Sequence, residues 1–146
     1  MSSTPQPADR TMPDQIIEDV VKSLTFNKDG LISAIAQQYD SGEVLMLAWM
    51  NGEAVRETLA TEQVCYWSRS RKQLWRKGEK SGQNQRLMHF RIDCDNDCLL
   101  LLVDQAGVAC HTGRRSCFYT EVTSEGLSII QPVEIDPEAL YGSDGQ

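Results

Sequence analysis

The spacing of apolar residues predicts two helices, one near the start of the chain and one before its middle. In "PDQIIEDVVKSL" (residues 13–24), apolar side chains recur every three or four positions, and Pro13 suits a first helical turn. In "GEAVRETLATEQ" (residues 52–63), Val55 and Leu59 share a face, and the side chain of Asn51 can cap the first turn. We therefore expect two short helices, each with one face packed on the rest of the protein.

The remaining apolar pattern predicts strands. The segments "LISAIAQQ" (31–38) and "VLMLAWM" (44–50) flank the turn signal "DSGE", which indicates a hairpin whose second strand is buried on both faces. Further strands are expected in "VCYWS" (64–68), "LMHFRIDCD" (87–95), "CLLLLVD" (98–104), "FYTEV" (118–122) and residues 127–133. The pattern is that of a mostly β protein with two helices.

Composition and charge narrow the class of protein. The 146 residues, 40% of them hydrophobic, suit one domain over residues 13–133, between a flexible tail (1–12) and a frayed tail (134–146). A net charge of −7 opposes binding of nucleic acid, which requires neutralisation of phosphates. Since neither a signal peptide nor an apolar span is visible, we expect a cytoplasmic protein that does not enter a membrane, with reduced cysteines.

Three of the five cysteines have a spacing that favours reactive rather than structural metal binding. Cys94, Cys110 and Cys117 follow the pattern C-x15-C-x6-C, which lacks the C-x2-C pairs of closed zinc sites. Three thiolates leave one position of a tetrahedral zinc ion for water, which then ionises near pH ~7. The alternative is that these cysteines are buried as small apolar side chains.

Three aspartates alternate with the first of these cysteines in "RIDCDNDC" (91–98). If this segment is extended, Asp93, Asp95 and Asp97 project to one side and Cys94 to the other. Carboxylates are hard ligands that suit Mg²⁺ or Ca²⁺, whereas thiolates suit zinc. The segment is therefore able to supply ligands to two different metals, unless it is simply a solvated acidic turn.

Histidine and basic residues complete the candidate chemistry. His111, next to Cys110, suits either a fourth zinc ligand or a general acid and base. Residues 69–85 hold six basic side chains, and we assign no helix or strand to this segment. Residues suited to binding a phosphorylated substrate, or equally to a solvated surface, are Arg69, Arg71, Trp75, Lys77, Ser81, Arg114 and Arg115.

The segment "DCDNDCLLLLVDQAGVACHTGRRSCFY" (93–119) resembles the signature of the phosphoribosyl-AMP cyclohydrolase family. Upstream, "VLMLAWMN" and "YWSRSRKQLWRKGEKSG" resemble the same family in the same order. The resemblance implies a hydrolase of histidine biosynthesis that opens the adenine ring of phosphoribosyl-AMP at the N1–C6 bond and yields ProFAR, the third step of the pathway. It also implies a dimeric α+β fold, mostly β: a compact mixed-sheet pseudo-barrel with two short helices.

The resemblance further implies how the candidate residues act. In the family, one zinc per subunit is held by Cys94 of one chain with Cys110 and Cys117 of the other, in a homodimer. One Mg²⁺ per subunit is held by Asp93, Asp95 and Asp97. From its residue type, we expect His111 to shuttle a proton in this chemistry. We expect no fused pyrophosphohydrolase domain. Two other functions stay open from the residues alone: a metal-stabilised binding module, and a zinc hydrolase of another nucleotide.

Overall fold

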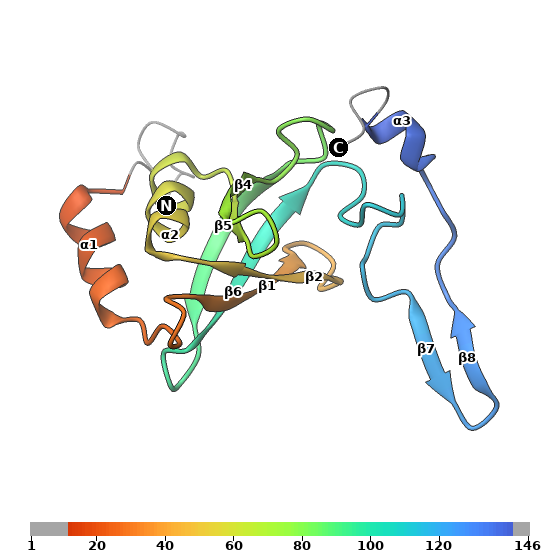
Figure 1. Cartoon of the computed structure of the whole chain (residues 1–146), viewed down its shortest axis with the longest axis horizontal. Helices are drawn as coiled ribbons and strands as arrows, with labels where there is room; N and C mark the ends of the chain where they lie inside the picture. The colour runs from red at the N-terminus through yellow and green to blue at the C-terminus, as the bar shows by residue number, and fades with distance from the viewer. Residues whose placement is uncertain (1–11, 142–146) are drawn as a thin grey trace, which may run out of the picture.

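A curled mixed sheet with two helices on one face forms the body of the protein (Figure 1). The computed structural model describes residues 12–141. The helices are α1 (Asp14–Ser23), α2 (Gly52–Thr61) and α3 (Pro137–Tyr141). The strands are β1 (Ile32–Gln38), β2 (Val44–Met50), β3 (Cys65–Ser68), β4 (Gln73–Arg76), β5 (Gln85–Ile92), β6 (Cys98–Gln105), β7 (Thr120–Thr123) and β8 (Gly126–Ile129).

Both predicted helices are confirmed, and their ends follow from local chemistry. Pro13 immediately precedes α1, whose Ile17 is buried. The side chain of Asn51 accepts a hydrogen bond from the backbone N–H of Ala54 at 2.8 Å, so the first turn of α2 is capped as expected. Val55 and Leu59 are buried on one face of α2, which packs on β2 and β3.

The six strands of the main sheet lie in the order β4-β3-β2-β1-β6-β5. The pair β1–β6 is parallel and every other pair in this sheet is antiparallel, so the sheet is mixed as expected. The apolar run of β6 occupies an inner position between β1 and β5, where Leu99, Leu101 and Val103 are buried. Together with Ala34 and Ala36 of β1 they form the sheet side of the core.

The sheet curls into a half-barrel because its far strand returns to the segment before β3. The backbone N–H of Val64 donates to the carbonyl of Gln85 at 3.0 Å, and that of Leu87 donates to Glu62 at 2.8 Å. The expected pseudo-barrel is thus only half closed. The third helix, α3, has five residues and was not predicted.

One local prediction was wrong, and one segment left unassigned contains a strand. The strand β2 is not buried on both faces, because Val44 and Leu47 are 42% and 46% exposed. Leu47 lies opposite Ile35 of β1 on the face that the helices leave uncovered. The basic segment 69–85, to which no element was assigned, contains β4, which pairs with β3 along its whole length.

The hairpin β7–β8 extends away from the main sheet (Figure 1). It corresponds to the two strands predicted near residues 118–133, although β8 ends at Ile129. Residues 1–11 of the expected N-terminal tail lie outside the described residues, as do residues 142–146. Residues 134–141 of the expected C-terminal tail include α3. Within residues 12–141, no helix has the length and apolar character needed to cross a bilayer.

Candidate active site

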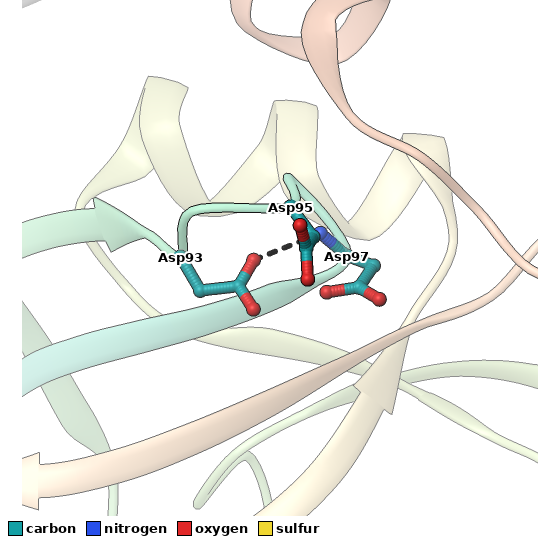
Figure 2. A group of neighbouring side chains, drawn as sticks. All are labelled: Asp93, Asp95 and Asp97. Carbon is teal, nitrogen blue, oxygen red and sulfur yellow. Dashed lines mark hydrogen bonds between the residues drawn. The ribbon is translucent and has the colours of Figure 1, made fainter.

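The acidic residues lie in a tight turn between β5 and β6. The expectation of an extended segment was wrong, because Asp93 folds it back: its Oδ1 accepts from the backbone N–H groups of Asp97 (3.0 Å) and Cys98 (3.2 Å). Asn96 takes the left-handed conformation that closes the turn. The turn nevertheless gathers the three carboxylates, which point toward one another (Figure 2) and offer oxygens within 4.8 Å of each other.

The gathered carboxylates repel one another. The pKa of Asp97 is raised, first by its hydrogen bond with the carboxyl group of Asp93 and also by the negative charges of Asp93 and Asp95. All three side chains are exposed. A divalent cation with oxygen ligands would remove this repulsion, so the turn is chemically suited to Mg²⁺.

Cys110 and Cys117 lie at the two ends of a loop at the opposite end of β6. Within the loop, the N–H of Ala109 donates to Arg115 (3.0 Å), that of Cys110 to Arg114 (3.1 Å) and that of Gly113 to Cys110 (3.0 Å). The loop therefore closes on itself and brings its two cysteines together. Desolvation and the neighbouring Cys110 raise the pKa of Cys117 to about 12, although the residue as a whole is exposed.

The loop is fixed to the sheet by contacts with β2 and with buried polar groups. The N–H of Cys117 donates to Leu45 at 2.7 Å, and the hydroxyl of Ser116 donates to Val44 at 2.8 Å. The guanidinium of Arg115 donates to the side chain of Gln38 (2.7 Å) and to the carbonyls of Gln105 (3.0 Å) and Gly107 (2.6 Å), and it pairs with Glu43.

The segment that follows the hairpin β7–β8 also packs on the loop. The N–H groups of Glu134 and Ile135 donate to the carbonyl of Gly113 at 2.8 and 3.1 Å. Gly113 has φ +86°, and a Cβ atom there would lie 1.9 Å from the carbonyl oxygen of Ile135. Only glycine satisfies both demands, because the conformation and the close approach each exclude a side chain.

A cleft of about 640 Å³ opens beside the loop. His111 and Cys117 line it, together with most of the segment from Arg71 to Ser81. Four of the predicted substrate-binding residues lie on its wall: Arg71, Trp75, Lys77 and Ser81. Lys77 is buried and donates from Nζ to the carbonyl of Gln83 at 2.9 Å; its burial lowers the pKa of the amine to about 8.

Three predicted substrate-binding residues do not line this cleft. The guanidinium of Arg69 lies 5.1 Å from the ring centroid of Trp49. That of Arg114 stacks 4.2 Å from the ring centroid of Tyr119 and donates to the carbonyl of Gln131 at 3.0 Å. Arg115 is occupied by the contacts that hold the loop.

Cys94 is far from the other two cysteines in a single chain. It lies in the acidic turn before β6, whereas Cys110 follows the end of β6. A strand of eight residues spans roughly 24 Å, so β6 separates the two ends by about that distance. Within residues 12–141, Asp93, Asp95 and Asp97 are the only group of three or more potential ligands close enough for one metal.

Comparison with known proteins decides the family. Residues 46–119 match the family model described as phosphoribosyl-AMP cyclohydrolase. The chain belongs to this family. It is therefore a hydrolase with phosphoribosyl-AMP cyclohydrolase activity in histidine biosynthesis, as the resemblance implied. Its nucleotide substrate follows from this identity, which decides against a non-catalytic binding module.

The relatives that share this name are similar over most of the chain. The phosphoribosyl-AMP cyclohydrolase of Alkalilimnicola ehrlichii is 65% identical over 84% of this chain and 86% of the relative. That of Paramagnetospirillum magneticum is 64% identical, over 84% and 92%. That of Granulibacter bethesdensis is 62% identical, over 87% and 100%.

Two residues of the cleft wall and a buried network of glutamines were not found from the sequence. Met46 and Pro137 lie on its wall. Gln85 and Gln105 are buried, and Gln85 links the hydroxyl of Tyr66 (2.7 Å) to the side chain of Gln105 (2.8 Å). Glutamine is ordinarily a surface residue, so the sequence carried no signal for this network.

Proposed function

We propose that this cyclohydrolase acts as a zinc- and magnesium-dependent homodimer that opens the adenine ring of phosphoribosyl-AMP. Water adds to C6 of the ring and the N1–C6 bond breaks, which gives ProFAR. The cleft beside His111 and Cys117 would hold the ring, because it is the larger of the two described clefts and carries the candidate reactive groups.

The zinc ligands in this proposal are Cys110 and Cys117 of one chain and Cys94 of its partner. Thiolates suit zinc, and Cys117 on the cleft wall has the thiol of Cys110 as its neighbour, which fits this role. When bound with three thiolates, zinc supplies a water molecule that ionises near neutral pH. The hydroxyl of Thr112 donates to Sγ of Cys110 at 3.1 Å and so helps to orient that ligand.

His111 is the proposed proton-transfer group. Its side chain lines the cleft and is exposed to it, and an imidazole can both accept and donate a proton near neutral pH. It would accept a proton from the attacking water and deliver one to the nitrogen released from C6. This nitrogen is N1, which gains the proton as the ring opens.

Substrate binding in the cleft is assigned to Arg71, Trp75, Lys77 and Ser81. Arg71 and Lys77 supply positive charge for phosphate, the hydroxyl of Ser81 can donate to it, and the indole of Trp75 offers an apolar surface to the base. Arg114 and Arg115 are assigned instead to the support of the loop, because their guanidinium groups are engaged by Gln131, Gln38 and backbone carbonyls.

Asp93, Asp95 and Asp97 are the proposed Mg²⁺ ligands. Their oxygens already converge within 4.8 Å, and their mutual repulsion would be relieved by a divalent ion. If two chains bring Cys94 of one to Cys110 and Cys117 of the other, the same contact brings the magnesium site close to the cleft. The charge of the ion would then offset that of the substrate phosphates.

The observation that carries the dimer is the separation of Cys94 from the other two cysteines by the length of β6. The hairpin β7–β8 supplies a surface for the contact. Val122 and Leu127 are paired across it and each is 75% exposed, and Ile129 lies on the same face. A two-stranded ribbon is marginally stable alone in water, so this apolar face is expected to pack on a second copy.

Mixing two inactive variants tests the proposal. Cys94→Ser and Cys110→Ser chains each lack one zinc ligand, and each should be inactive. After exchange of subunits, half of the dimers contain one chain of each kind, and one of their two shared sites is intact. Activity should therefore return to about a quarter of the wild-type value, since random pairing populates the mixed dimer at one half. A mixture that stays inactive although mixed dimers form would contradict a shared site.

A further inference from the structure

A second, smaller cleft of about 330 Å³ adjoins the one that holds His111. All three tryptophans of the chain line it: Trp49 of β2, Trp67 of β3 and Trp75 of β4. Trp49 and Trp67 are register partners in the pair β2–β3, so their rings stand side by side on the sheet. The cleft thus has aromatic walls.

The rim of this cleft is basic and rich in hydroxyl groups. The guanidinium of Arg69 lies 5.1 Å from the ring centroid of Trp49, which holds it over the cleft. The hydroxyl of Ser68 accepts from the N–H of Arg71 at 3.2 Å and lies 3.4 Å from that of Ser70. Among the described residues that line this cleft there is no carboxylate, although the chain carries a net charge of −7. Such a surface is suited to a ligand that carries both a ring and an anionic group.

The two clefts are joined. Arg71 and Trp75 line both of them, so a single ligand that lies across these two residues reaches both cavities. Phosphoribosyl-AMP is such a ligand, because its adenine ring carries two ribose 5-phosphate groups, one belonging to AMP and one to the phosphoribosyl substituent. The basic rim of the second cleft offers the second phosphate a site of its own.

We propose that the second cleft binds one ribose 5-phosphate end of the substrate while the adenine ring occupies the first cleft. Arg69, Ser68 and Ser70 contact the phosphate, the tryptophans pack on the sugar, and Arg71 lies between the two ends of the ligand. This inference rests on the proposed placement of the reacting ring beside His111. It makes the second cleft the feature that distinguishes a substrate with two phosphates from a mononucleotide.

The variant Arg69→Gln tests this inference. Arg69 is exposed and its side chain contacts the Trp49 ring, so the fold should be retained. Loss of one charge-assisted hydrogen bond to phosphate should raise KM about tenfold, with kcat within about twofold of wild type. Arg86→Gln is the matched control, because Arg86 is an exposed arginine of β5 outside both clefts, and its KM should not change.

Ribose 5-phosphate provides a direct binding probe. Since every tryptophan lines the second cleft, this probe should change the intrinsic fluorescence of the wild-type protein and of Arg86→Gln, and it should bind about tenfold more weakly to Arg69→Gln. An unchanged KM in Arg69→Gln, or equal binding of the probe, overturns the inference. A separate variant tests the proposed role of His111. If that role is wrong, His111→Asn retains the wild-type kcat, whatever the result for Arg69→Gln.

Discussion

The acidic turn and the cysteine loop lie at opposite ends of β6, and they are organised in different ways. In the acidic turn, the side chain of Asp93 bonds to backbone groups four and five residues later, so the carboxylates are gathered by their own segment. The cysteine loop is held by Gln38, Leu45 and Gln131, which are far away in the sequence. The three carboxylates are thus gathered by local contacts, whereas the pairing of the two cysteines depends on the completed fold.

The largest effect should come from the cysteine loop itself. Cys110→Ser should abolish turnover and remove most of the bound zinc, because it deletes one of three thiolate ligands. Formation of ProFAR is followed by absorbance, and zinc is measured by elemental analysis of the purified protein. Cys98→Ala is the control, since Cys98 begins β6 and belongs to neither proposed metal site, and it should remain active. Normal zinc and full activity in Cys110→Ser would refute the assignment of the thiolates.

A smaller effect, confined to magnesium, should follow from the acidic turn. Asp95→Asn removes a negative ligand and should raise the Mg²⁺ concentration needed for half-maximal activity about tenfold or more, with little loss of zinc. Titration of activity with Mg²⁺ measures the first quantity and elemental analysis the second. Asp14→Asn, in the exposed first turn of α1, should behave as wild type. Equal loss of both metals in Asp95→Asn would mean that the two sites are not separate.

The support of the loop should be measurable as stability. Arg115→Lys loses several of the hydrogen bonds that the planar guanidinium makes to Gln38, Gln105 and Gly107, which should lower the free energy of unfolding by about 2 kcal/mol. Denaturant titration measures the change, and Arg86→Lys serves as the control. The Mg²⁺ requirement of Arg115→Lys should be unaltered, because the acidic turn does not depend on this contact.

The smallest effect is a difference in thiol reactivity. In metal-free protein, iodoacetamide should modify the exposed Cys94 well before Cys65, which is fully buried in the core. Burial also raises the pKa of Cys65 to about 11, so its thiol stays protonated at neutral pH. Peptide mapping after a short exposure distinguishes the two. Equal modification would indicate that the sheet opens on the time scale of the experiment.

The elements predicted correctly are those whose structure is determined by residues close to one another in the sequence. The cap at Asn51, the hairpin before β2 and the apolar run of β6 each follow from adjacent residues, and each is present. The incomplete barrel depends in part on a hydrogen bond between Val64 and Gln85, which lie 21 positions apart in the sequence. No local pattern encodes such a contact, and the same holds for the place of Pro137 beside the cleft.

The candidate site shows the same division. Cys110, Cys117 and His111 were singled out by residue type; the structure places the two cysteines beside each other, and Cys117 and His111 on the cleft wall. The turn at residues 93–97 was expected to be extended, because alternating aspartates imitate a strand when the bond from the Asp93 side chain is not considered. Buried glutamines such as Gln105 were missed, because their role depends on partners that only the fold supplies.

The bare backbone at Gly113 has a consequence for the way this enzyme can vary. A single methyl group at that position would push the carbonyl of Ile135 aside, and the chain beyond it would lose its place at the cleft, whose wall includes Pro137. Substitutions in the cysteine loop and in the segment that leads to α3 are therefore constrained together, because Gly113 has to lack a Cβ atom.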